Sequence, residues 1–387
     1  MLTSMVFAWA VALFFAMNIG ASGTASSMGA AYGGGAIKRA WAALVLVGVA
    51  VFLGAVLGGG PVVKTLSQGL ISPSVINIHV AIIILAAACV TLFSANLLGI
   101  PLSTSEVTVG AVLGVGIAYH SIHVWRVLFI AGVWIAMPFL AFVIAYVVGK
   151  FVLRAENRLK LETRPAWMRT LFTLFLIGAG CYEAFSAGMN NVANAVGPLV
   201  GAKLVSVHTG IWWGALFVAL GAVVLGRRVL ETNAKRITDL SLMQGSLVSL
   251  TSGTLVFVSS LYGLPVPLTQ ATTMAIFGIG VSKRGSSLWQ QGIVKRILKI
   301  WIVSPVSALV VSYTMIEIFM STDLYALIIV LSAVVMSVGY LSYFRQRGQK
   351  DAERQESARI DVVSMTSTSV PTGPFTGKNG NGDDPVA

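Results

Sequence analysis

Long runs of apolar residues, separated by short polar stretches, follow one another along most of the chain. Eleven of these runs are candidates for membrane-embedded helices, since a transmembrane helix needs about 20 mostly apolar residues. Two of them, 101–118 and 265–281, are marginal for a full crossing and could form re-entrant segments. The pattern predicts an all-α integral membrane protein. The hydrophobic segments lie near 6–37, 41–58, 76–99, 101–118, 127–149, 170–203, 209–226, 242–263, 265–281, 301–320 and 324–344.

The first segment carries the wrong residues for a simple membrane helix. After an apolar start at Val11, the stretch to Ile37 is rich in glycine, serine and threonine. Glycine lets the backbone leave the helical path, and inside a bilayer irregular backbone is tolerated only where protein or a watery cavity surrounds it. The stretch alone is equally compatible with close helix packing, because small residues let helices approach one another.

A similar stretch occurs a second time and favours the first interpretation. Residues 188–205 align with 20–37 at an offset of 168 (188 − 20), and residues 265–281 align with 101–117 at an offset of 164 (265 − 101). Two motifs in the same order and at nearly the same offset indicate an internal duplication. Matched positions include Gly20 with Gly188, Ser22 with Asn190, Ser26 with Asn194, Ser105 with Thr269, Glu106 with Gln270, and Thr108 with Thr272.

Composition and charge agree with a membrane protein and predict its orientation. Of the 387 residues 56% are hydrophobic and 10% are charged, whereas a soluble chain has roughly a quarter charged residues. Lys and Arg accumulate in cytoplasmic loops, so the net charge of +12 does not call for nucleic acid as a partner. The basic loops of the second half fall on the side opposite to the matching loops of the first half. We therefore expect an inverted-topology repeat of 5 + 5 + 1 hydrophobic segments with paired broken or re-entrant helices, the N-terminus outside and the C-terminus in the cytoplasm.

This topology divides the chain into five parts. The last of them is polar, cannot bury a core, and is expected to be a disordered cytoplasmic tail. The parts are a first transmembrane repeat at 1–149, a basic cytoplasmic linker at 150–169, a second, inverted repeat at 170–320, a final transmembrane helix at 321–345, and the tail at 346–387.

The polar residues of the paired motifs are candidate ligands for an anion. Transporters with inverted repeats bind substrate near the middle of the membrane, where half-helix ends meet, and helix N-termini attract anions. Hydroxyl and amide groups are neutral donors that suit an oxyanion, although Ser and Thr can equally bond to their own backbone. The predicted substrate-binding residues are Asn18, Gly20, Ser22, Gly23, Thr24, Ser26, Ser103, Thr104, Ser105, Asn190, Asn191, Asn194, Thr269 and Thr272.

Two acidic residues, Glu106 and Glu183, lie within or beside these motifs. An ionisable group at membrane depth costs at least ~2.5 kcal/mol, so it is a candidate for function. Desolvation favours the uncharged form of a carboxyl group, and either residue could carry a proton; the alternative is a neutral acid that caps a helix break. No cysteine pair has metal-ligand spacing, so we expect neither a metal nor a cofactor.

The duplicated motifs resemble the signatures of the inorganic phosphate transporter family, Gly-Ala-Asn-Asp-x-Ala-Asn in each half followed by Pro-x-Ser-Thr-Thr-His. Here they read GASGTAS from Gly20 and GMNNVAN from Gly188. Gly23 and Asn191 occupy the aspartate positions of the signature, and Glu106 with Gln270 the histidine positions. The resemblance covers roughly residues 5–345. The resemblance to the bacterial sulfate permease branch of this family, of the CysP type, extends over longer stretches. These stretches are the runs FFAMNIGASGTASSMGAAYGGGAIK and ANLLGIPLSTSEVTVGAVLGVG.

The resemblance implies a secondary active transporter in the cell membrane that imports a small tetrahedral oxyanion by alternating access. Family phosphate carriers use the signature aspartates at their sodium and phosphate sites, so their loss favours sulfate, a dianion that can only accept hydrogen bonds. The expected partners are sulfate or a related oxyanion, H⁺ rather than Na⁺ as the coupling ion, and the lipid bilayer. A homodimer is compatible with this expectation.

Two alternatives remain open at this point. One is a sodium-coupled inorganic phosphate symporter. The other is a membrane-embedded enzyme that acts on a headgroup or a lipid-linked substrate. An enzyme should show a nucleophile or a paired acid and base, and the sequence has neither an Asp pair nor a His cluster in these motifs, so we expect no enzymatic activity.

Overall fold

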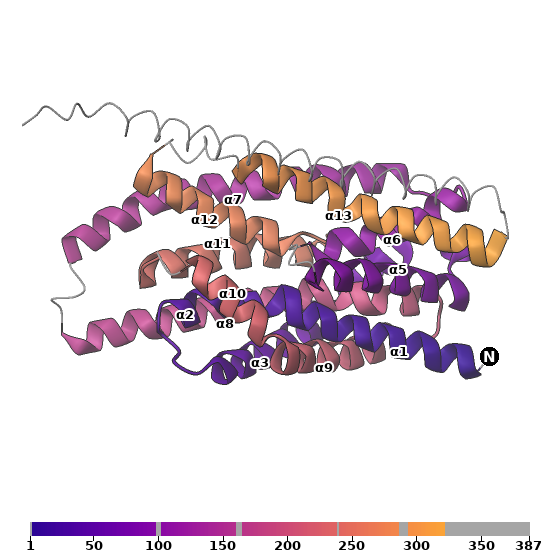
Figure 1. Cartoon of the computed structure of the whole chain (residues 1–387), viewed down its shortest axis with the longest axis horizontal. Coiled ribbons are helices and arrows are strands. Elements are labelled where there is room, and N and C mark those ends of the chain that lie inside the picture. Colours follow the sequence, from indigo (N-terminus) through magenta and orange to yellow (C-terminus); the bar gives the residue numbers. More distant parts are fainter. Residues whose placement is uncertain (1, 98–101, 160–164, 238–239, 286–292, 322–387) are drawn as a thin grey trace, which may run out of the picture. The chain divides into compact units, whose positions relative to one another are not determined.

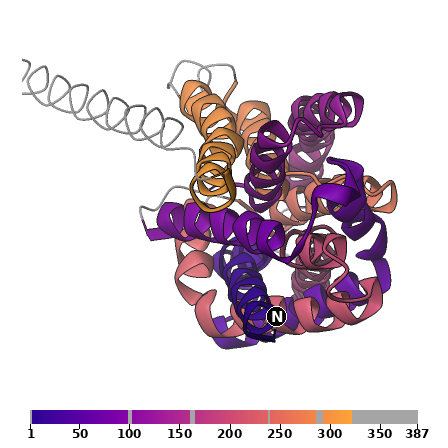
Figure 2. The same ribbon diagram turned by 90° about the vertical axis from the view of Figure 1, so that its right-hand side faces the viewer.

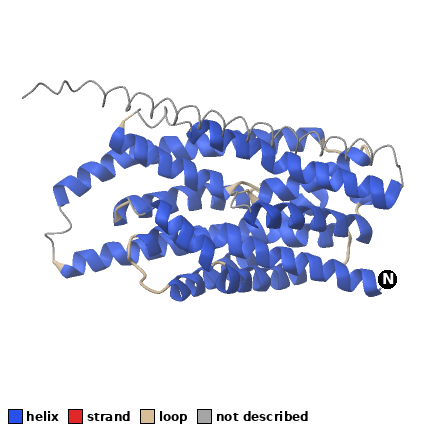
Figure 3. Ribbon diagram, viewed as in Figure 1, coloured by secondary structure: helices blue, strands red, loops and turns tan. Residues whose placement is uncertain are grey.

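The structure is a computed structural model that describes residues 2–97, 102–159, 165–237, 240–285 and 293–321. The described part of the chain is helical and contains no strand (Figure 3), apart from an isolated antiparallel bridge between Ile71 and Ile122. Eight helical segments in it are long and apolar enough to cross a membrane. The prediction of an all-α membrane protein is therefore confirmed.

Ten of the eleven predicted hydrophobic segments coincide with helices, and the eleventh, at 324–344, lies outside the described residues, as does the tail. Figure 2 shows most helices nearly end-on, so they run roughly parallel to one another. In chain order (Figure 1) the α-helices are α1 (Leu2–Ile19), α2 (Gly29–Gly33), α3 (Ala40–Gly58), α4 (Gly60–Lys64), α5 (Ile78–Leu97), α6 (Thr104–Ala118), α7 (Val124–Leu159), α8 (Ala166–Gly201), α9 (Val207–Leu225), α10 (Arg227–Ile237), α11 (Leu242–Leu261), α12 (Leu268–Arg284) and α13 (Ile293–Ile316).

Several stretches that were predicted as loops are helical. The region 59–75 contains α4 and a π-helical turn, Thr65–Gly69, and the region 227–241 contains α10. The basic linker predicted at 150–169 is mostly helix as well, because α7 continues to Leu159 and α8 already begins at Ala166. Polar residues in these stretches ended the apolar pattern, but they did not end the helices, since Lys, Arg and Glu are good helix formers.

Two helical hairpins enter the bundle from opposite ends (Figure 1). Helix α5 packs against α6, and α11 packs against α12. The α5–α6 pair lies at the end where the chain starts, and the α11–α12 pair lies at the other end. Helix α6 has 15 residues, which is fewer than a full crossing needs. This arrangement supports the re-entrant alternative for 101–118 and 265–281.

Closely packed glycines show that the two halves repeat the same helix contacts. A Cβ at Gly20 would overlap the carbonyl oxygen of Val218 in α9, and a Cβ at Gly188 would overlap that of Val51 in α3. The glycines are 168 residues apart (188 − 20) and the carbonyls 167 (218 − 51). The end of α1 therefore packs against α9 as α8 packs against α3, with the backbones in direct contact, as glycine permits.

The hairpins repeat their contacts in the same way. Gly114 in α6 lies against the carbonyl of Leu309 in α13, and Gly278 in α12 lies against the carbonyl of Phe142 in α7. These positions are 164 (278 − 114) and 167 (309 − 142) residues apart. Each hairpin thus packs on the long helix of the other half. The reciprocal contacts support the internal duplication, while the opposite orientation of the halves across a membrane stays a prediction.

Large apolar side chains cover much of the outer surface. Ile135 and Phe139 in α7 are 74% and 64% exposed, and Trp213 in α9 is 49% exposed. Exposed apolar area on this scale is unfavourable in water, and in a bilayer it is the surface that lipid covers. The polar residues of the motifs are found on the inside instead.

Candidate functional site

The first polar stretch distorts its helix, as predicted, without opening it. After α1 the chain forms a π-helical turn, Gly20–Thr24, and a 3₁₀ turn, Ala25–Met28, before α2 resumes. The hydroxyls of Ser22, Thr24 and Ser26 donate to backbone carbonyls three or four residues earlier, at 2.9, 2.7 and 2.8 Å. Such back-bonding bends helices, and π turns mark irregular sites.

The second polar stretch is not broken, so the prediction of a paired break is wrong here. Helix α8 runs without interruption through Asn190, Asn191 and Asn194 to Gly201. These three amides are at most 2% exposed. They bond to other helices rather than to the backbone of α8, so they leave its own hydrogen bonds intact.

Asn190 joins three elements at the centre of the molecule. Its Oδ1 accepts a hydrogen bond from Ser105 Oγ at the start of α6 and one from the backbone N–H of Val266, both at 3.1 Å. Its Nδ2 lies 2.9 Å from Ser260 Oγ and from the carbonyl oxygen of Leu264. One side chain of α8 thereby holds the starting end of α6 and the segment between α11 and α12.

Asn191 and Asn194 extend this network along α8. Thr104 Oγ1 donates to Asn191 Oδ1 at 3.1 Å, and Asn194 Nδ2 lies 3.4 Å from Thr104 Oγ1 and 3.5 Å from Ser105 Oγ. A Cβ at Gly23 would be 3.5 Å from Asn191 Nδ2. The two aspartate positions of the signature, Gly23 and Asn191, therefore face each other beside α6. We refer to Thr104, Ser105, Asn190, Asn191 and Asn194 as the amide–hydroxyl network.

Glu106 lies in the first turn of α6 and is paired with Gln270 of α12. Ser103 caps this helix by accepting from the backbone N–H of Glu106 at 3.4 Å, and Gln270 Nε2 donates to Glu106 Oε1. Both side chains are buried, and Glu106 Oε2 and Gln270 Oε1 have no hydrogen-bond partner among the described residues. Gln270 was not among the predicted site residues, although its alignment with Glu106 at an offset of 164 was a signal for it.

Glu183 belongs to a second, separate cluster. Its Oε1 accepts from Ser252 Oγ at 2.9 Å and from Thr272 Oγ1 at 2.8 Å. The carboxyl group is buried between α8, α11 and α12. The predicted ligand Thr272 is thus a partner of Glu183 and not a member of the amide–hydroxyl network.

The remaining predicted ligands stand apart from the network. Asn18 Nδ2 donates to the carbonyl of Phe14 at 3.0 Å, and the carbonyl of Thr269 accepts from Thr273. Gly20 packs against α9. Within the described residues no hydrogen bond joins Asn18, Ser22, Thr24, Ser26 or Thr269 to the network.

The arrangement offers hydrogen-bond donors of the kind that a small anion can use. Helices α6 and α12 both begin near the network, and a helix N-terminus carries free N–H groups and partial positive charge. The network itself consists of neutral amides and hydroxyls, whose donors now pair with one another. In the described ranges no group of three or more His, Cys, Asp or Glu side chains could hold a metal.

A helical membrane bundle in which the start of α6 and the segment between α11 and α12 meet at a buried polar network has the features of a membrane transporter. The model of the phosphate transporter family matches residues 19–312. The chain belongs to this family.

Individual relatives give the following similarities. The sulfate permease CysP of Bacillus subtilis (strain 168) is 50% identical over 330 residues, which cover 85% of this chain and 92% of the relative. A protein of Pyrococcus furiosus that carries the name of a phosphate permease is 28% identical over 386 residues, covering 78% and 93%. The solved structure "The sodium-dependent phosphate transporter" matches with a TM-score of 0.72 at 24% identity, covering 82% of this chain and 98% of that one. The last similarity supports the fold.

Proposed function

We propose that this protein imports sulfate, or a closely related tetrahedral oxyanion, across the cell membrane. The observation that carries the proposal is the pairing of Gly23 with Asn191 beside Thr104, where the family signature has two aspartates. The 50% identity to a relative named as a sulfate permease points the same way. Family members are named as permeases and transporters, which supports transport over the enzyme alternative.

The chemistry of the two anions explains why the missing carboxylates matter. Hydrogen phosphate carries a proton that it can donate to a carboxylate, whereas sulfate near neutral pH can only accept hydrogen bonds. A carboxylate facing sulfate would repel it and form no bond with it. A site of neutral donors therefore favours sulfate by omitting the group that phosphate could use.

Binding requires the amide–hydroxyl network to exchange partners. Asn194 Nδ2 and the hydroxyls of Thr104 and Ser105 now bond within the protein, at 3.1–3.5 Å. Several of these bonds are long, so turning the donors toward an anion would cost little and would gain stronger, charge-assisted bonds. The N-termini of α6 and α12 add free backbone donors.

We propose H⁺ as the coupling ion, with Glu106 as the first carrier. An inside-negative potential opposes entry of a dianion by about 2.3 kcal/mol per charge per 100 mV, so uptake needs co-transported cations. A protonated Glu106 would carry a donor on Oε2 that matches the unpartnered Oε1 of Gln270. With the existing bond from Gln270 Nε2, this would form a reciprocal acid–amide pair. Protonation would also remove a negative charge next to the dianion, which links the two binding events.

Neutralising both charges of sulfate needs a second proton, and Glu183 is the proposed second carrier. Glu183 belongs to α8, the helix that also supplies the three asparagines, and its side chain is buried. Ser252 and Thr272 connect it to the α11–α12 hairpin. Movement of this hairpin would change the solvation of Glu183 and of the network together, as alternating access requires.

Competition for uptake tests the substrate. The purified protein in proteoliposomes should take up labelled sulfate, with protein-free liposomes as the control. Excess unlabelled sulfate should suppress this uptake and equal phosphate should not. If phosphate displaces sulfate at equal concentration, the sodium-coupled phosphate alternative replaces the proposal. No labelled uptake of either anion would leave the transporter assignment without support.

A further inference from the structure

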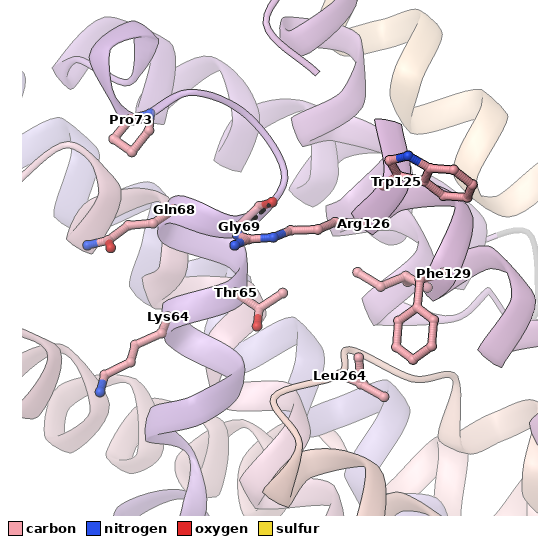
Figure 4. A pocket seen from close by; sticks show the side chains of 10 residues that line it. Lys64, Thr65, Gln68, Gly69, Pro73, Trp125, Arg126, Phe129 and Leu264 are labelled. Atoms are coloured by element: carbon pink, nitrogen blue, oxygen red, sulfur yellow. Dashed lines mark hydrogen bonds between the residues drawn. The ribbon is translucent and has the colours of Figure 1, made fainter. Parts of the chain in front are cut away.

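A cavity of about 660 Å³ opens between the π-helical turn after α4 and the start of α7 (Figure 4). It lies outside the amide–hydroxyl network and contains none of the predicted site residues. Basic and polar side chains form one part of its wall and aromatic side chains another. The lining residues are Lys64, Thr65, Gln68, Gly69, Pro73, Trp125, Arg126, Phe129, Ile130 and Leu264.

Both charged residues that line the cavity are cations. Lys64 and Arg126 come from chain segments about sixty residues apart (126 − 64 = 62), and no carboxylate lines the cavity with them. Arg126 is held in place, because its Nη1 donates to the carbonyl of Gly69 at 3.3 Å. A guanidinium group has five N–H donors, so this bond leaves most of them for another acceptor. Figure 4 shows Thr65 below Arg126, and the Lys64 side chain extends away from the guanidinium group.

The floor of the cavity is one residue away from the network. Leu264 lines the cavity, and its carbonyl oxygen accepts from Asn190 Nδ2 at 2.9 Å. The neighbouring Gly263 has a positive φ of 71°, and a Cβ there would lie 2.9 Å from the carbonyl oxygen of Pro61. The segment between α11 and α12 therefore rests directly on α4 and separates the cavity from the site.

We infer that this cavity is an entrance vestibule that binds a sulfate or phosphate group in front of the buried network. Like charges in a cleft with low-dielectric walls focus the field and raise the local concentration of an opposite ion. The vestibule supplies two such charges on one side of the Leu264 floor. This inference rests on the proposed transport of an oxyanion and adds the place where the ion is captured.

The vestibule should affect the apparent affinity for sulfate on the external side of the membrane and should not affect the rate of the transport step. Lys64→Gln and Arg126→Gln should each raise the KM for external sulfate about threefold to tenfold at low salt, with an unchanged kcat, and the difference should shrink at high ionic strength. Lys64→Arg should behave as the wild type. Lys203→Gln is the matched control, because Lys203 is an exposed cation outside the cavity. An unchanged KM in both cavity variants, in vesicles with and without phosphatidylglycerol alike, would overturn the inference.

The composition of the vesicle separates dissolved sulfate from a lipid phosphate as the bound group. If dissolved sulfate is bound, the KM effect appears equally in vesicles with and without phosphatidylglycerol. If the cations hold a lipid headgroup, the two variants differ from the wild type in phosphatidylglycerol vesicles and match it in vesicles of phosphatidylcholine. Either result supports an oxyanion site at Lys64 and Arg126.

A labelling experiment tests the charge of the vestibule and its binding of sulfate without measuring transport. In Gln68→Cys protein, a negatively charged methanethiosulfonate should react faster than a positively charged one, and sulfate should slow it more than chloride of equal ionic strength. Removing both cations should abolish this preference. The parent protein is the control for the two native cysteines, because Cys89 is buried but Cys181 is partly exposed; its labelling rate is subtracted. If labelling shows the preference and uptake is absent, the proposed function fails and the vestibule stands; equal rates and no protection would overturn the vestibule.

Discussion

The two halves of the molecule repeat the same helix contacts, but the polar residues of their motifs form different hydrogen bonds. In the first half, short hydroxyl side chains bond back to the backbone between Asn18 and Ser26, and the helix changes to π and 3₁₀ turns. In the second half, asparagines at matched positions reach across to α6 and to the α11–α12 segment, and α8 stays regular. The matched motifs therefore differ in what their hydrogen bonds join: one set bends its own helix, and the other holds separate helices together.

This difference assigns separate roles to the two halves. The second half supplies the amides that bond to other elements. The first half supplies Thr104 and Ser105 from its hairpin and, at Gly23 in its distorted helix, a position without a side chain that faces Asn191 and Thr104. Removing a hydrogen-bonding side chain should therefore have a large effect in α8 and a small effect in the stretch after α1.

The largest effect is expected from Asn190→Ala. The change leaves the hydroxyl of Ser105, the N–H of Val266 and the carbonyl of Leu264 without a partner, each at a cost of about 1–3 kcal/mol. A loss of about 3 kcal/mol corresponds to at least a 100-fold fall in sulfate uptake. Thermal unfolding of the purified variant shows how much of this is lost stability. Asn18→Ala, whose amide bonds only to a backbone carbonyl, is the control and should transport normally; equal losses in both would refute the assigned role.

Asn194→Ala should weaken binding without separating the helices. If Asn194 Nδ2 donates to a charged oxygen of the substrate, its loss costs ~1.5–3 kcal/mol, or about 10- to 150-fold in Kd. Calorimetric titration with sulfate measures this directly. A change of less than about threefold would mean that Asn194 does not touch the anion.

Gly23→Asp should reverse the preference between the two anions. The new carboxylate would lie near Asn191 Nδ2 and Thr104, where it would repel sulfate and accept a bond from hydrogen phosphate, with an expected loss of at least about tenfold in sulfate affinity. Gly23→Ala is the neutral control, because a Cβ there meets its nearest neighbour at 3.5 Å. Competition between labelled sulfate and phosphate provides the measurement, and an unchanged ratio would count against the selectivity argument.

The smallest effects are expected for Ser22→Ala and Ser26→Ala. Their hydroxyls donate to carbonyls of their own helix at 2.9 and 2.8 Å, so their removal should change the KM for sulfate by less than about threefold, in line with the small net value of such bonds. A loss comparable to that of Asn194→Ala would show that these hydroxyls turn toward the substrate during transport.

The sequence predicted the helix contacts of this molecule better than the hydrogen bonds of its buried polar residues. The two offsets of 168 and 164 pair Gly20 with Gly188 and Gly114 with Gly278, and each pair makes equivalent contacts with the backbone of another helix, because a repeated backbone contact requires glycine at the same place. The motif pattern could not show that α8 would stay straight, since that depends on what its asparagines reach. Their partners Ser260 and Leu264 are 70 and 74 residues away in the chain.

Residues without a motif were the hardest to find. Gln270 was aligned with Glu106 but lay outside the predicted ligands, because a neutral amide signals a site only when its partner is known. Lys64 and Arg126 belong to neither of the repeated motifs. Their common cavity arises from the folding of Thr65–Gly69 against the start of α7, which periodicity does not encode.

Coupling to protons is the central claim, and sulfate uptake driven by an imposed gradient tests it most directly. Proteoliposomes are given an acidic outside without sodium, or a sodium gradient at equal pH, and wild type is compared with Glu106→Gln and the control Glu317→Gln. Glu317 is a half-buried carboxyl residue in the π-helical turn after α13 and belongs neither to the network nor to the Glu183 cluster. An acidic outside loads the carrier with protons, so wild type and Glu317→Gln should accumulate sulfate under the pH gradient, and Glu106→Gln should fail to do so while still exchanging sulfate at equal pH. Accumulation that follows sodium and ignores pH, or normal accumulation by Glu106→Gln, would contradict the account.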